Sequence, residues 1–135
     1  NFMSFDIFLN AFSNGATASF NIEVLKAAFG PDARFEDDFS RVRFPDGSGG
    51  DIYGADEPEI SNLMFNHCGG DAFFEAMLEL ARRTNGLIFW PSEPATAISP
   101  NEDALAHAQP EFLEAFDDVK IARTTEDLRA AIEQT

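Results

Sequence analysis

The sequence predicts an α+β fold: a mostly antiparallel or mixed sheet of about 5–6 strands, with a main helix over residues 71–84 packed on one face and smaller helices around it. Two observations favour this class. Short apolar runs bounded by Gly, Pro and Asn alternate with segments of helical periodicity, so hairpins and helices are mixed along the chain. The 135 residues, of which 44% are hydrophobic, suit one domain over residues 1–135.

The first half is expected to contain a strand, a short helix and a hairpin. Apolar residues predict a strand over 4–12, with Phe5, Ile7 and Leu9 on one face and Phe8 and Phe12 on the other, so we expect both faces to be covered. A helix over 20–29, capped by Ser19 or Asn21, should end at Gly30. Residues 41–44 and 51–53 then predict the two strands of a hairpin, and 60–67 a further strand.

The helix over residues 71–84 is the best-defined element of the chain. Its apolar stripe recurs every three to four residues and comprises Phe73, Met77, Leu80 and Ala81. We expect Asp71 to cap the free N–H groups of the first turn. Asn85-Gly86 provides the residues that usually end a helix.

The last third predicts two strands that pair back on each other, at 87–90 and 95–98. Ser99-Pro100-Asn101-Glu102 matches a capping box, from which a helix should run to about residue 108. A helical turn over 110–116, a strand over 119–122 and a terminal helix starting at Thr124 complete the prediction.

Charge excludes several classes of partner. Nine Lys and Arg against 24 Asp and Glu give a net charge of −15, which would repel nucleic acid and anionic membranes. No apolar run of about 18 residues is present, so no membrane span is expected. The start of the chain lacks the basic and apolar regions of a signal peptide, and we expect a cytoplasmic protein. Met3 is a candidate start residue, with Asn1 and Phe2 as remnants of cloning.

One local cluster suggests chemistry. His67, Cys68 and Asp71 place an imidazole, a thiol and a carboxylate where a strand enters a helix, which would suit a small enzyme or ligand-binding domain with Trp90 as a further candidate residue. The alternative is a buried structural cysteine beside a loop. Adjacent strand residues point to opposite faces, which favours this alternative.

No metal site, cofactor or catalytic residue is predicted. His67, His107 and Cys68 are too few for zinc, which takes about four nitrogen or sulfur ligands. The loop 46–51 lacks the residue order of a calcium loop, and no phosphate-binding glycine motif is present. Paired carboxylates are frequent, but 24 acidic residues produce such pairs by chance.

Acidic and aromatic residues concentrate between positions 36 and 59. As a partner-binding surface, this segment offers Glu36, Asp37, Asp38, Phe39, Asp46, Asp51, Tyr53, Asp56, Glu57 and Glu59. Carboxylates speed encounter with a basic protein, and aromatic side chains supply affinity. The competing interpretation is a solvated face that only keeps the protein soluble.

These observations lead to an expected function without an enzymatic step. We expect an acidic binding protein that neutralises or escorts a basic protein, in the manner of a bacterial immunity protein blocking a cationic toxin. An acidic secretion chaperone and the small enzyme built on residues 67–71 are the alternatives. No motif assigns the chain to a family, so the analogy is one of class.

Overall fold

The computed structural model describes residues 5–30 and 39–134 of the chain. Seven of its strands form one mixed sheet, in the order β11-β10-β9-β1-β8-β6-β5. Their bounds are β1 (Ile7–Asn10), β5 (Phe39–Arg43), β6 (Gly49–Tyr53), β8 (Asn62–Gly69), β9 (Leu87–Trp90), β10 (Thr96–Ser99) and β11 (Asp118–Ile121). Only the pair β10 and β11 is parallel within this sheet. The predicted α+β class is therefore confirmed, with a sheet one to two strands wider than expected.

Two small ribbons flank the sheet: β2 (Phe12–Ser13) with β3 (Ala16–Thr17), and β4 (Phe20–Asn21) with β7 (Glu59–Ile60). They break the first and fourth predicted strands into shorter pieces. The described helices are α1 (Ile22–Phe29), α2 (Asp71–Thr84), α3 (Glu102–Leu105), α4 (Pro110–Leu113) and α5 (Thr125–Glu133). None of the helices in this described part of the chain has the length and apolar character needed to cross a membrane.

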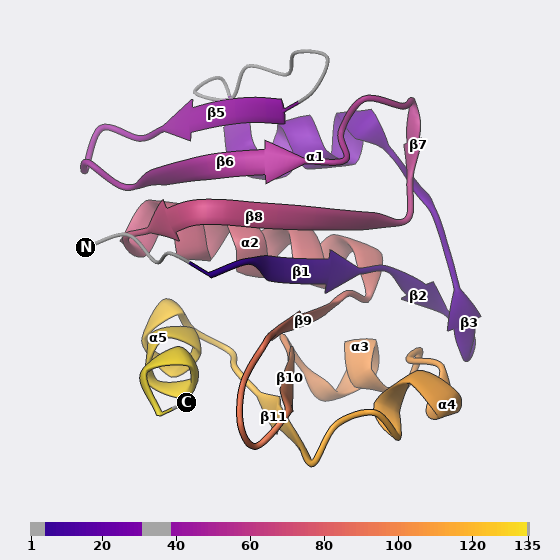
Figure 1. Ribbon diagram of the computed structural model, residues 1–135. Helices are drawn as coiled ribbons and strands as arrows, with labels where there is room; N and C mark the ends of the chain where they lie inside the picture. Colours follow the sequence, from indigo (N-terminus) through magenta and orange to yellow (C-terminus); the bar gives the residue numbers. More distant parts are fainter. Residues whose placement is uncertain (1–4, 31–38, 135) are drawn as a thin grey trace.

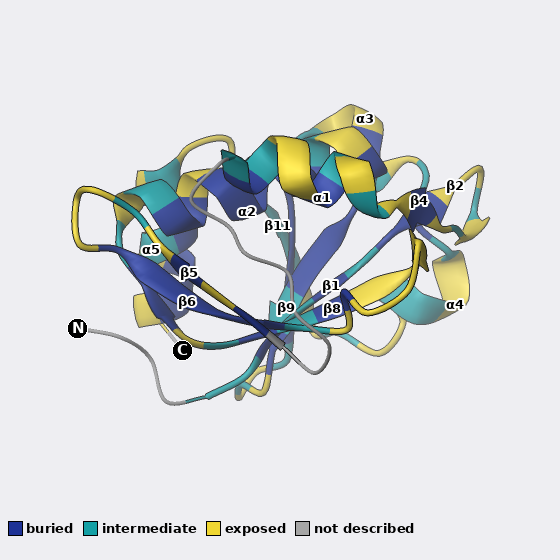
Figure 2. Cartoon of the chain, turned by 90° about the horizontal axis from the view of Figure 1, so that it is seen from above, coloured by how far each residue is buried: buried dark blue, intermediate teal, exposed yellow. Residues whose placement is uncertain are grey.

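Helices α1 and α2 cover one face of the sheet and lie behind β5, β6, β8 and β1 in Figure 1. Figure 2 shows the same layering from above, with the buried side of both helices turned toward the strands. Alternation along β1 sends Ile7 and Leu9, both fully buried, into this helix-facing core. Phe8 therefore lies on the opposite face of the sheet, which we call the open face.

The start of α2 is built differently from the prediction. The residue at the N-cap position is Gly70, which has no side chain to accept hydrogen bonds from the first N–H groups of the helix. Acceptors come instead from the turn between β5 and β6: Asp46 accepts from the backbone N–H of Ala72 at 3.1 Å, and the Ser48 hydroxyl accepts from that of Phe73 at 3.2 Å. The expectation that Asp71 caps the helix is wrong, because Asp71 is already its first helical residue.

A second correction concerns α3. Asn101, not Ser99, caps this helix, because its side-chain oxygen accepts from the N–H of Ala104 at 2.7 Å. Ser99 is instead the last residue of β10 and is fully buried. The helix ends at Leu105, earlier than the expected end near residue 108, and turns join it to α4, which lies within the helical turn expected over 110–116.

Candidate functional site

The predicted partner-binding residues are spread along β6. Glu36, Asp37 and Asp38 lie outside the described residues, and of Phe39 only the backbone, at the start of β5, is described. Asp46 precedes β6, Asp51 and Tyr53 belong to it, and Asp56, Glu57 and Glu59 follow its other end. The carboxylates at 46 and at 56–59 therefore lie beyond opposite ends of one strand.

Two of these carboxylates are engaged inside the fold. Asp46 binds the start of α2, and hydrogen bonds from the Ser48 hydroxyl and N–H lower its pKa. Asp51 is only 6% exposed, and its carboxylate lies 3.1 Å from Nε of Arg41, its cross-strand partner. Nδ1 of His67 lies 3.8 Å from the other carboxylate oxygen. Both acids therefore have structural partners.

The other described acids of the predicted set are exposed, as is Asp46. Asp56 and Glu57 lie in the loop after β6, and Glu59 begins β7. The Glu59 carboxylate accepts hydrogen bonds from Ser19 at 3.4 Å and Asn21 at 3.3 Å. Asp56 and Glu57 are consequently the acids of this set most available to a partner among the described residues.

The structure separates the thiol, imidazole and carboxylate of the segment 67–71. Cys68 is fully buried, and burial raises the pKa of its thiol to about 12. His67 is exposed on the other side of the strand, at a residue with φ of 48°. Asp71 is exposed and forms an ion pair with Arg129 of α5. At neutral pH the buried thiol is protonated, so this arrangement provides no activated nucleophile.

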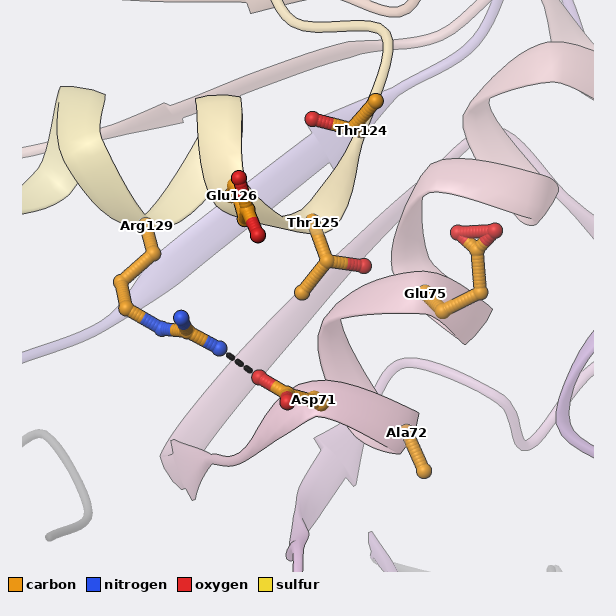
Figure 3. A pocket seen from close by; sticks show the side chains of 7 residues that line it. All are labelled: Asp71, Ala72, Glu75, Thr124, Thr125, Glu126 and Arg129. Atoms are coloured by element: carbon orange, nitrogen blue, oxygen red, sulfur yellow. Dashed lines mark ion pairs between the residues drawn. The ribbon is translucent and has the colours of Figure 1, made fainter.

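A pocket of about 590 Å³ lies between the first turns of α2 and α5 (Figure 3). Its lining consists of Asp71, Ala72, Glu75, Thr124, Thr125, Glu126 and Arg129. The ion pair between Arg129 and Asp71 crosses it, as the dashed line in Figure 3 shows. The lining contains no thiol or imidazole, and among the described residues no group of three or more His, Cys, Asp and Glu is placed to hold a metal ion.

The open face carries a row of apolar side chains across the sheet. Successive cross-strand partners in this row are Tyr53, Met64, Phe8, Phe89, Ala97 and Val119. All of them except Ala97 are partly exposed. A polar row runs beside it, in which Arg41 pairs with Asp51, Asp51 with Asn66, and the Asn66 amide donates to Asp6.

Four rings on the open face form what we call the aromatic cluster: Phe8, Phe89, Phe112 and Phe116. Phe89 lies at its centre, with its ring centroid 5.4 Å from those of Phe8 and Phe112 and 5.5 Å from that of Phe116. Phe112 also contacts the buried ring of Phe12, beneath which Leu87 and Ala108 complete a second small core. All four rings of the cluster remain partly exposed. Helix α4 and its following turn thus pack against the open face and extend its apolar surface.

No family model, curated protein or solved structure matches the chain. Function therefore has to be argued from the surface itself.

Charge is distributed unevenly around the aromatic cluster. Every Lys and Arg of the chain lies within residues 26–83 or 120–129. The stretch 84–119, which contributes β9, β10, α3 and α4, has no Lys or Arg and seven acidic residues: Glu93, Glu102, Asp103, Glu111, Glu114, Asp117 and Asp118. The partner-binding surface predicted at residues 36–59 does not include this stretch. The absence of Lys and Arg over 36 residues was the signal that could have identified it.

Proposed function

We propose that the protein is a non-enzymatic acidic binding protein that neutralises or escorts a basic protein. The class that fits best is a bacterial immunity-type inhibitor of a cationic toxin. The observation that carries this proposal is the surplus of carboxylates over basic side chains, 24 against nine. The net charge is −15, and seven of the nine Lys and Arg side chains already form ion pairs with acids of this protein: Lys26, Arg41, Arg82, Arg83, Lys120, Arg123 and Arg129.

Exposed acids outside these pairs are available for a partner. Asp56, Glu57, Glu111 and Glu114 are exposed, and none of them forms an ion pair with another described residue. Such a surface attracts a cationic protein over roughly a Debye length, about 8 Å at physiological salt, and raises the rate of encounter. Carboxylates of this kind can occupy the positions of nucleic-acid phosphates on a cationic nuclease.

The chemistry of the side chains supports binding more than catalysis. The thiol of Cys68 is buried and protonated at neutral pH, and the carboxylates with lowered pKa have structural partners. Glu79 is held by Arg83 and Arg82, and Glu102 by Arg123. None of these carboxylates has the raised pKa that a general acid needs at neutral pH.

The experiment is a binding measurement with the product of the neighbouring gene, co-expressed and purified with this protein. Calorimetry at about 0.05 M and about 0.5 M salt should give a dissociation constant that rises at least about tenfold. Reversal of the charges at Asp37, Asp38, Asp56 and Glu57 should slow association. A tight complex whose affinity does not change with salt, or a neighbouring product that is acidic and does not bind, would contradict the proposal.

A further inference from the structure

We infer that the aromatic cluster is the docking surface for the basic partner, and that the partner presents arginine side chains to it. This inference rests on the proposed function and adds the location of contact and the chemistry of the contacting group. The surface consists of Phe8, Phe89, Phe112 and Phe116, and the exposed Glu111 and Glu114 precede and follow Phe112 in α4 and its C-cap.

The rings offer faces as well as apolar area. Phe8 and Phe89 are stacked, with an angle of 19° between their planes, whereas Phe112 and Phe116 are inclined to Phe89 by 68° and 64°. A group that lies on this cluster therefore meets ring faces in more than one orientation. The planar guanidinium of arginine stacks on such faces and sheds its water more easily than the ammonium of lysine.

The charge around the cluster complements a cation. The elements that build it lie in residues 5–25 and 84–119, and neither stretch contains a Lys or Arg. Glu111 and Glu114 flank Phe112 in the chain, and Asp6 lies just before β1, two residues before Phe8, where its carboxylate accepts from the Asn66 amide. The basic residues of the open face, Arg41 and Arg43, belong to β5, which β6 and β8 separate from β1. The aromatic part of the open face is therefore built from stretches of the chain that carry carboxylates and no Lys or Arg.

The same charge argues against a second copy of this chain as the occupant. Two molecules that each carry −15 repel each other, most strongly where both present carboxylates without basic residues. A cationic partner removes this repulsion and gains the apolar contact. The combination of a partly exposed aromatic centre and a charged rim is that of a protein-binding surface.

The first test maps the binding of a defined probe, an arginine–glycine repeat peptide, by amide chemical shifts of the full-length protein. The largest shifts should fall on β1, β9 and α4. Three double variants change the net charge equally: Glu111→Lys with Glu114→Lys, Asp56→Lys with Glu57→Lys, and Glu126→Lys with Glu133→Lys. We expect the first to raise the dissociation constant at least about fivefold more than the other two. Equal effects of all three, or shifts spread evenly over the surface, would overturn the inference.

The second test separates ring chemistry from apolar area. Phe116→Leu keeps an apolar side chain of similar size at a partly exposed position but removes the ring face. The wild type should bind the arginine–glycine peptide about threefold more tightly than a lysine–glycine peptide of equal length, as one cation–π contact predicts. Phe116→Leu should reduce this ratio to about one while the protein remains folded at the temperature of the binding measurement. A ratio that is already one in the wild type, or that survives in the variant, would contradict the role of the rings.

Binding of the neighbouring gene product distinguishes a failure of the docking surface from a failure of the proposed function. Salt-sensitive binding that the Glu111 and Glu114 pair does not weaken more than the other two pairs would refute the docking surface and leave the proposed function in place. Binding that is absent or insensitive to salt would refute the proposed function itself. A homodimer that buries Phe116 at micromolar concentration would also overturn the docking surface, because the rings would then serve self-association.

Discussion

Phe8 on β1 and Phe89 on β9 stack across two neighbouring strands, with ring centroids 5.4 Å apart. The pair joins the sheet to α4, because Phe89 also contacts Phe112 and Phe116. Phe8→Ala should therefore lower the free energy of unfolding by about 2 kcal/mol, less than for a fully buried ring because Phe8 is partly exposed. Urea unfolding measures this loss. Phe8→Leu is the control and should recover about half of it; a Phe8→Ala protein with the wild-type midpoint would show that the stack contributes nothing.

Because the β5–β6 turn caps α2, the small side chain of Ser48 should contribute measurably to the free energy of unfolding. Ser48 is buried, and its hydroxyl donates to Asp46 and accepts from the N–H of Phe73. Ser48→Ala should lower the free energy of unfolding by about 1 kcal/mol, because one N–H of the first turn loses its acceptor. Ser61→Ala, in which an exposed hydroxyl accepts from the Asn62 side-chain amide at 3.4 Å, is the control. Equal stability of the two variants would contradict the capping role.

Asp46 should make this capping dependent on pH. Its pKa in the fold is lowered from 3.8, so it stabilises the native state fully above that value. The contribution is lost as the pH falls through the lowered pKa, because protonation removes an acceptor. The difference in unfolding midpoint between the wild type and Asp46→Asn should therefore be largest at neutral pH and shrink below about pH 4. A difference that grows on acidification would contradict this sign.

Gly70 should tolerate no side chain. Its φ is +97°, and a Cβ at this position would lie 2.1 Å from Cβ of Ser48. Gly70→Ala should lower the free energy of unfolding by about 3 kcal/mol, from backbone strain and steric overlap together. Gly15→Ala is a matched control, because Gly15 also has positive φ, +82°, but no atom within 4 Å of the added Cβ. It should lose only about 1 kcal/mol, the strain alone. Equal losses would show that close approach does not matter.

The thiol of Cys68 should be unreactive in the native state. Burial raises its pKa to about 12, so the thiolate fraction at pH 8 is about one in ten thousand. Alkylation with iodoacetamide at pH 8 should be at least about a hundredfold slower than in urea, where the thiol regains its ordinary pKa and access. Rapid labelling of the folded protein would contradict this burial and revive a chemical role for the segment 67–71.

Local patterns predicted the elements, whereas contacts between distant residues escaped prediction. Helix α2 has the bounds expected from its apolar stripe, and the hairpin of β5 and β6 closes on the turn at 45–48. The cap of α2 could not be predicted, because Asp46 lies 26 residues before the N–H that it accepts from. The aromatic cluster likewise joins residues from three separate stretches of the chain. Of the features of this surface, only the lack of Lys and Arg over 84–119 can be recognised from the sequence.

The dependence of α2 on Asp46 and Ser48 also bears on how the chain folds. A helix of 14 residues is marginal alone in water, and this one begins with glycine and no side-chain cap of its own. Its first turn becomes favourable only once the β5–β6 hairpin has closed. We therefore expect the hairpin and the start of α2 to behave as one cooperative unit, whose amide hydrogens exchange with a common opening free energy.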